Sequence, residues 1–487
     1  MYLRKLSIVN FVKSQANNKH MGSIVHQFTM KAFIFLFFCF STFATSAQKD
    51  IKKRSDRDGA VVKKEQKKLR SDDYYDPDFI RYSDYIYKNS ITTVLFHRDG
   101  WELTPPVITF GTDEKLLLSF DELDGNYTTY QYTVLHCDAE WNPTDLWQNE
   151  YIEGFTDGYI QDYIFSFNTL QAFINYSLVI PNDNFKFTLS GNYLLKVYPD
   201  GQPDNPILTR RFMVVEPNIN VEAIVKPASI INQRFTHQEV QFSLFISSYP
   251  VNEPMRDLKV VVLQNYRWDN ALWGLKPMMI RGKELDYRYT DGTNTFEAGN
   301  EFRYFDIKSL RYNSERVGTI ERRNDGYHVQ LLPDKVRARA PYITYEDISG
   351  QRLIKTEDAN NATTESEYVW VDFFLPYEAP LTGGGVYIIG ALTDWQFYAP
   401  GNSPEMAAGN GRMEYNFARQ GYEARLYLKQ GYYNYMYAYL PDGAEKAETA
   451  MIEGNRYETK NTYSILVYYR EPGSRYDRLI AVKVVGN

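Results

Sequence analysis

The sequence predicts an all-β protein of tandem immunoglobulin-like or early-set β-sandwich domains, which follow a signal peptide and a short disordered tail. Aromatic residues make up 16% of the chain, with 41 Tyr and 29 Phe, and such side chains favour the half-buried surface of a pleated sheet. Short apolar runs alternate with Gly, Asn, Asp and Pro turn signals at the spacing typical of sandwiches. We find no amphipathic helix of convincing length between them.

The N-terminal region predicts export. Residues 30–47 combine a positive end at Lys31, a short apolar core and small residues before Gln48, which is the pattern of a secretory signal peptide. The apolar core is too short to span a bilayer, for which about 20 residues are needed. We therefore expect residues 1–47 to hold an over-called start and a signal peptide. Cys39 follows bulky residues, so a lipid anchor is not expected.

Residues 48–80 are expected to form a basic flexible tail. Between Gln48 and Arg70 there are ten Lys and Arg against four Asp and Glu, whereas the whole chain has a net charge of −7, so an acidic body follows. A solvated arm is the ordinary interpretation of such a charge run, and docking to an acidic partner or a lipid surface is the alternative. An acidic body without a basic stripe argues against nucleic acid as a partner.

The first β-sandwich is expected over residues 81–217. Its β-forming runs are separated by turn signals at 124–126, 190–192 and 199–201. The expected strands are 91–96, 116–120, 130–135, 193–198 and 211–215.

Two further units follow, a second β-sandwich over 218–355 and a linker with a third, early-set-like β-sandwich over 356–487. Three domains also fit the chain length at about 100–200 residues per domain. The polar stretch 356–365 is the expected linker. The third unit includes a tyrosine-rich hairpin expected around Gln430 and Gly431. The β-forming runs are 219–223, 239–246 and 258–263 in the second unit, and 368–375 and 386–390 in the third.

The sequence contains no recognisable catalytic or cofactor-binding motif. His97, His136, His237 and His328 are widely separated and lack metal-ligand spacing. No G-x-S-x-G, H-E-x-x-H or P-loop pattern is present, and the glycines at 383–385 are expected to form a flexible turn. We therefore expect a non-enzymatic protein with no catalytic residue, no metal, no cofactor and no small-molecule substrate.

Two local patterns that suggest chemistry have simpler interpretations. His136 and Cys137 are adjacent in an expected strand, where neighbours point to opposite faces, so Cys137 is expected to be a small buried hydrophobe. With Cys39 in the signal peptide, Cys137 also has no partner for an intramolecular disulfide. The acidic cluster at 121–124 precedes a Gly-Asn turn and is expected to be a solvated loop.

Aromatic residues in expected loops are candidates for partner binding. Trp141 and Trp147 lie in one such segment, and Tyr266, Trp268 and Trp273 in another. These loops either fold back on their own sandwich or present anchors to a partner, because Trp, Tyr and Arg dominate interface hot spots.

Long segments of the chain resemble the type IX secretion system plug protein family. In the first unit the resemblance rests on segments 91–94, 105–108, 116–123, 130–141 and 151–154, and in the second on 264–270 and 298–306. Proteins of that family are periplasmic. They occlude the periplasmic opening of the large outer-membrane translocon barrel of that secretion system.

The resemblance implies a non-enzymatic, periplasmic plug on the inner side of the outer membrane, monomeric on its own, with the translocon barrel as its partner. Separately, segments 386–395 and 431–435 of the third unit are similar to starch-binding and early-set sandwiches. The alternative function is therefore periplasmic glycan binding, for which Trp395 is the candidate residue. In such sandwiches, however, an aromatic at that place often only fixes its loop.

Overall fold

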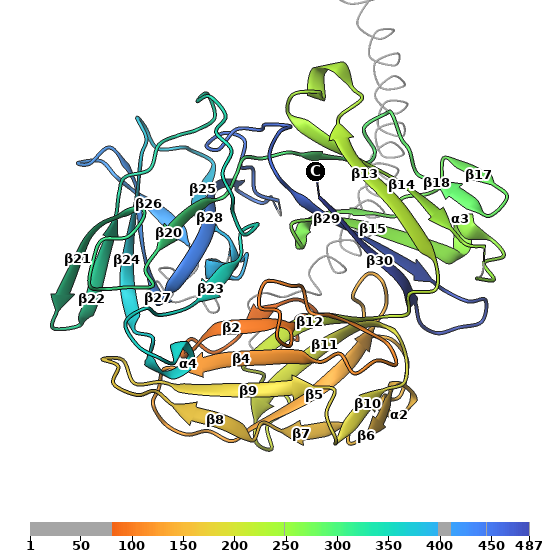
Figure 1. The fold of residues 1–487 in the computed structure, drawn as a ribbon, viewed down its shortest axis with the longest axis horizontal. Helices are drawn as coiled ribbons and strands as arrows, with labels where there is room; N and C mark the ends of the chain where they lie inside the picture. The colour runs from red at the N-terminus through yellow and green to blue at the C-terminus, as the bar shows by residue number, and fades with distance from the viewer. Residues whose placement is uncertain (1–79, 248, 398–410, 445, 487) are drawn as a thin grey trace, which may run out of the picture. The chain divides into compact units, whose positions relative to one another are not determined.

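Figure 1 shows the computed structural model, which describes residues 80–486 except 248, 398–410 and 445. The expected signal peptide and nearly all of the expected tail lie outside these residues. The described chain is nearly all β, which confirms the predicted fold class. None of its helices is long and apolar enough to cross a membrane.

The first sandwich consists of two main sheets around one core. One has the strand order β1-β12-β11-β5-β7, with β3 beside β12, and the other has the order β2-β4-β9-β8. β6 and β10 form a separate ribbon. The elements are β1 (Tyr85–Ile86), β2 (Ile91–Arg98), β3 (Val107–Thr109), β4 (Leu116–Glu122), β5 (Tyr130–Cys137), α2 (Gln148–Tyr151), β6 (Ile152–Gly154), β7 (Asp157–Tyr159), β8 (Asp162–Phe165), β9 (Ile174–Ile180), β10 (Phe185–Phe187), β11 (Gly191–Pro199) and β12 (Leu208–Val215).

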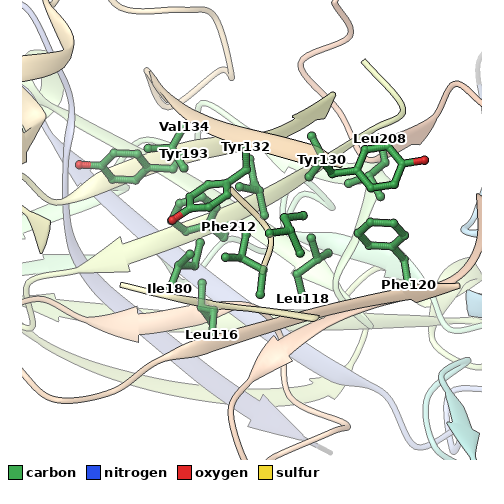
Figure 2. Packing of buried hydrophobic residues seen from close by; sticks show 14 of the residues in the cluster. Leu116, Leu118, Phe120, Tyr130, Tyr132, Val134, Ile180, Tyr193, Leu208 and Phe212 are labelled. Atoms are coloured by element: carbon green, nitrogen blue, oxygen red, sulfur yellow. The ribbon is translucent and has the colours of Figure 1, made fainter. Parts of the chain in front are cut away.

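The alternation of side chains along β4 shows why these residues form a sandwich. Leu116, Leu118 and Phe120 are fully buried and share one face of the strand, because side chains alternate between the two faces of a sheet. Figure 2 shows them within the core together with residues of β5, β11 and β12. Burying one such side chain stabilises the fold by about 1.5–3 kcal/mol.

The second sandwich is completed by the C-terminal strands. Its sheets have the orders β13-β14-β18-β17, with β19 beside β14, and β16-β15-β29-β30. Tyr463, Ile465 and Val467 of β29 are buried in the same core as Val240 of β14 and Val260 of β15. The elements are β13 (Asn220–Pro227), η1 (Ile231–Gln233), β14 (His237–Phe245), α3 (Pro254–Asp257), β15 (Leu258–Gln264), β16 (Arg267–Trp273), β17 (Met279–Arg281), β18 (Glu284–Asp286), β19 (Thr295–Glu297), β29 (Thr462–Tyr469) and β30 (Arg478–Gly486).

The third region is one sheet that runs in the order β20-β28-β25-β26-β27-β24-β22-β21, with β23 beside β28. Its core is formed by residues between Phe305 and Ile452. The elements are β20 (Arg303–Asp306), β21 (Val317–Arg323), β22 (Gly326–Leu331), β23 (Arg352–Ile354), α4 (Ala362–Glu365), β24 (Tyr368–Pro376), β25 (Gly384–Ile389), η2 (Ala391–Thr393), β26 (Arg412–Asn416), β27 (Gly421–Lys429) and β28 (Gly431–Pro441).

The strand pairing differs from one sequence-based expectation. The hairpin expected around Gln430 is not formed, because β27 pairs with β24 and β26 while β28 pairs with β25, β20 and β23. Gly431 lies so close to β23 that a Cβ there would meet the Leu353 carbonyl at 2.5 Å. The boundaries 218–355 and 356–487 stay predictions. The pairing leads us to propose that the third region is an insertion in the second sandwich.

Candidate partner-binding surface

Trp141 lies inside the protein, which corrects its prediction as an exposed partner anchor. The residue is 3% exposed and belongs to an apolar cluster formed by β5, β11 and β12 of the first sandwich and β15, β29 and β30 of the second. Its ring meets half-buried Trp268 edge to face, with centroids 5.1 Å apart. The Arg211 guanidinium lies 4.5 Å from the Trp141 centroid. Such burial and cation–π contact stabilise the joint between the sandwiches.

The other predicted aromatics differ in exposure. Trp147 precedes α2 and is 78% exposed, and Trp273 at the end of β16 is 42% exposed. Tyr266 is half-buried in the turn before β16, and desolvation raises the pKa of its hydroxyl. The segment expected as a loop at 267–273 is a strand of the second sandwich. Partner binding by Trp147, Tyr266, Trp268 and Trp273 remains a prediction.

A pocket of about 230 Å³ beside Trp273 holds charged side chains that already pair with one another. The Lys259 ammonium lies 2.7 Å from Glu140 and 3.2 Å from Asp477. Asp477 also receives two hydrogen bonds from Arg470, at 2.7 and 2.9 Å. Burial alone would raise the pKa of Asp477, but Arg470, the Ala139 amide and Lys259 hold it below its usual value. We interpret this cluster as a structural link between the sandwiches.

Two acidic residues expected in a solvated loop are instead fully buried, so that prediction is wrong for Asp121 and Glu122. Asp121 accepts hydrogen bonds from Lys429 at 2.6 Å and from the Tyr368 hydroxyl and the Asn175 amide at 2.7 Å each. Burial lowers the pKa of Lys429, and Asp121 opposes that shift. These contacts link β4 of the first sandwich to β24 and β27 of the third region.

His136 and Cys137 point to opposite sides of β5, as expected. The His136 ring packs on Tyr193, with centroids 4.9 Å apart, whereas Cys137 belongs to the apolar cluster around Trp141. Burial lowers the pKa of His136 to about 4 and raises the pKa of the Cys137 thiol to about 12. Cys137 is therefore a buried thiol, as predicted, and not a poised nucleophile.

One edge of the first sandwich carries a run of exposed apolar residues, which we name the aromatic rim. β7 and β8 are the last strands of the two sheets that enclose the first core, so the rim lies where both sheets end. Exposed fractions run from 39% at Tyr163 to 71% at Phe155. The rim consists of Tyr127, Phe155, Tyr159, Tyr163, Ile164, Phe165, Phe167 and Leu170.

Several rim side chains pack against one another and against the core. The Tyr163 ring lies 4.6 Å from Tyr127, 5.9 Å from Phe165 and 6.1 Å from buried Tyr176, measured between centroids. These contacts hold the aromatic rings in a defined arrangement before any partner arrives. Grouped exposed apolar residues are typical of interaction sites, whereas scattered ones are ordinary.

The two strands of the rim carry carboxylates and no base. Asp157 lies in β7 and Asp162 in β8. Residues 144–180 as a whole contain five carboxylates and no Lys, Arg or His, although Glu150 is paired with Arg475. The other carboxylates are Asp145, Glu153, Asp157 and Asp162.

Comparison with known proteins identifies the family. A sequence model described as the type 9 secretion system plug protein 1st domain matches residues 91–216. The chain belongs to the type IX secretion system plug family. It is similar to a solved structure of a hypothetical protein from Parabacteroides merdae ATCC 43184, with 37% identity and a TM-score of 0.78 over 84% of this chain and 100% of that one. No curated protein matches it.

In this plug-family protein, Trp395 is held by its surroundings. It is half-buried, and its ring meets Phe302 edge to face, with centroids 5.9 Å apart. The Arg267 guanidinium lies 5.3 Å from the ring centroid, and a Cβ on Gly350 would meet the ring at 2.5 Å. These contacts favour the interpretation in which the aromatic residue fixes its loop.

The aromatic rim of the plug-family domain was missed by sequence reasoning, which concentrated on tryptophans. A usable signal is present in Tyr163, Ile164 and Phe165, three successive apolar residues flanked by polar ones. Such a run belongs in a strand buried on both faces or at a binding edge, because an ordinary edge strand alternates polar and apolar residues.

Proposed function

We propose that this protein is a non-enzymatic plug that acts in the periplasm and occludes the periplasmic opening of the outer-membrane translocon barrel of the type IX secretion system. Its family membership associates the chain with that system. A wide pore needs a stopper that fills space and binds reversibly, and neither task requires bond-making chemistry. Three large β cores and an acidic, apolar docking surface suit this role.

The observation that carries the proposal is the position of the aromatic rim. Apart from Tyr127, which is also within it, every rim residue falls between 155 and 170, inside the matched range of 91–216. The family domain thus presents a preformed apolar surface to solvent. A stable docking interface buries about 1,200–2,000 Å² in total, which the rim and the surface around it would have to supply.

Purification of the full-length tagged protein from envelopes in mild detergent tests the proposal. We expect a very large outer-membrane barrel protein to co-purify in near-equal amounts. Recovery of the protein alone, as a monomer in the membrane-free periplasm, would contradict the proposal.

Loss of the gene provides a second test. If the barrel stays intact, the outer membrane should become permeable to large hydrophilic antibiotics that it normally excludes. Unchanged sensitivity to these antibiotics, with the barrel present at normal levels, would argue against occlusion. The Trp395 ring packs against Phe302 of its own chain, which argues against glycan binding as a second function.

A further inference from the structure

We propose that β8 is an acceptor strand, to which an extended segment of a partner protein adds by β-sheet hydrogen bonding, and that this segment carries Lys or Arg among apolar residues. The inference deepens the proposed function, on which it depends for the identity of the partner but not for the mode of docking.

The backbone direction of β8 follows from its last ladder bond. The Ser166 amide donates to the Phe173 carbonyl at 2.9 Å, and the register pairs Phe165 with Ile174, so residue 166 faces β9. Backbone groups alternate sides in an antiparallel strand, so those of Tyr163 and Phe165 face away from β9. The Phe167 amide confirms this alternation, because it also points away and donates to the Thr364 carbonyl at 2.9 Å.

The outward edge of β8 is open for a limited length. β8 is the last strand of its sheet, and no described strand lies along its outer side. Farther along the chain, Thr364 accepts from the Phe167 amide and Glu367 accepts from the Leu170 amide at 2.9 Å, so the third region covers that part. The open window is therefore the four residues of β8, about 13 Å at 3.3 Å per residue. An added strand would bond the amide and carbonyl groups of Tyr163 and Phe165.

β8 carries no Lys, no Pro and no bulge, which are three of the features that protect natural edge strands from pairing. All four residues of β8 are exposed. Tyr163 and Phe165 share the face that continues the buried core, since Tyr163 pairs with Tyr176 and Phe165 with Ile174. Apolar residues of an added strand would extend that core outward.

The negative charge near the open edge of β8 indicates which kind of partner segment would bind there. Asp162 lies in β8, Asp157 lies in β7, and no base lies between residues 144 and 180. A second copy of this chain would bring further carboxylates and no base to this edge, and an anionic lipid surface would be repelled by them. A partner segment with Lys or Arg opposite Asp162 and apolar residues against Tyr163 and Phe165 satisfies both features.

Photo-crosslinking of the full-length protein in living cells tests the docking. A benzophenone amino acid replaces Ile164 in β8, and a control protein carries it at Ile231 of η1, which is 88% exposed. Mass spectrometry then gives the sequence of the cross-linked peptide. We expect position 164 to capture one segment of another protein, with Lys or Arg among apolar residues. Capture of lipid, of a second copy, of an acidic segment, or nothing above the control would overturn the proposal.

Paired substitutions separate strand addition from simple apolar contact. Tyr163→Ala removes the ring and keeps the outward amide, whereas Tyr163→Pro removes both and leaves the ladder to β9 intact. We expect the proline variant to lower the crosslink yield at position 164 at least tenfold more than the alanine variant. Equal losses, or no loss in either variant, would reject strand addition. If thermal melting shows that the Tyr163→Pro variant is not folded, Phe165→Pro and Phe165→Ala are used in place of the two Tyr163 variants.

The outcomes also distinguish this inference from the proposed function. Co-purification with the barrel without a crosslink at position 164 would refute the acceptor strand and leave the plug role standing. A basic, extended crosslinked segment from a different envelope protein, without co-purification of the barrel, would support the acceptor strand and refute the plug role.

Discussion

Asp121 and Lys429 form an ion pair in which the two side chains are 0% and 2% exposed. Removing one partner of a buried pair leaves an uncompensated charge and typically costs about 3–5 kcal/mol. The cost is higher than at the surface because the remaining charge has no access to water. The exposed pair of Arg425 and Asp372, at 2.6 Å, provides a matched comparison.

We expect Asp121→Asn to lower the free energy of unfolding by about 3–5 kcal/mol. The control Asp372→Asn should cost less than about 1 kcal/mol, because surface pairs contribute little. Urea titrations followed by tryptophan fluorescence measure both values. A loss from Asp121→Asn that is no greater than that from Asp372→Asn would show that the buried pair does not hold the first sandwich to the third region.

The buried His136 predicts a pH dependence. Its pKa in the folded protein is lowered to about 4 from the ordinary 6.5, so the unfolded chain binds the proton more readily. The contribution of neutral His136 to the free energy of unfolding is therefore fully present above pH 6.5 and is lost as the pH falls toward 4. The loss approaches about 3 kcal/mol, at 1.36 kcal/mol per pKa unit.

The measurement is the free energy of unfolding between pH 4 and 7, compared with that of His136→Gln. This substitution keeps a polar side chain near Thr144 and the Ser190 carbonyl, the hydrogen-bond partners of the ring, but does not titrate. The two proteins should differ in pH dependence by about 3 kcal/mol across that interval. Parallel curves would mean that His136 does not cause the acid sensitivity.

The C-terminal strands β29 and β30 are half of one sheet in the second sandwich. β29 pairs with β15 from Leu258 to Gln264, across about two hundred residues of intervening chain. A protein that ends at residue 461 would expose the core residues that pack against Tyr463 and Ile465. Contacts so far apart in the sequence cannot be replaced locally.

We expect this truncated protein to accumulate as insoluble material, because it loses two of the four strands of the sheet. Ending the chain at residue 485 instead should have little effect on solubility, since only the end of β30 is removed. Soluble yield and limited proteolysis of both proteins provide the measurement. A soluble, protease-resistant product ending at 461 would contradict the assignment of β29 to this sandwich.

Sequence reasoning predicted the β class and some of the longer strands, such as β4, β5 and β24, because alternation and turn signals are local. It did not predict β9, β29 or β30. It failed where a distant residue decides the outcome. Asp121 precedes a Gly-Asn turn and suggests a solvated loop, but Lys429 and Tyr368 lie about 250–300 residues away in the sequence and bury it. Trp141 is covered in the same way by the second sandwich. The tyrosine hairpin was mispredicted because adjacent strands in sequence pair with other neighbours.

In the described chain as a whole, the sandwiches are joined by buried contacts, and the aromatic rim is left at an outer edge. The cluster around Trp141 joins the first two, and the Asp121–Lys429 pair joins the first to the third region. Trp141 is thus used inside the protein, whereas β7 and β8 keep their apolar residues exposed. This distribution is expected of a body that fills space and docks through one edge.

Docking through the rim is tested most directly by measuring how much translocon barrel co-purifies with a rim variant. This variant combines Phe155→Ser, Phe165→Ser and Phe167→Ser. Its matched control combines Ile224→Ser, Ile231→Ser and Phe235→Ser, which are 58%, 88% and 69% exposed on the second sandwich. The tagged wild-type and control proteins should retain the translocon barrel in mild detergent, and the rim variant should retain at least tenfold less while melting at a similar temperature. Equal recovery of the barrel by all three proteins would contradict docking through the rim.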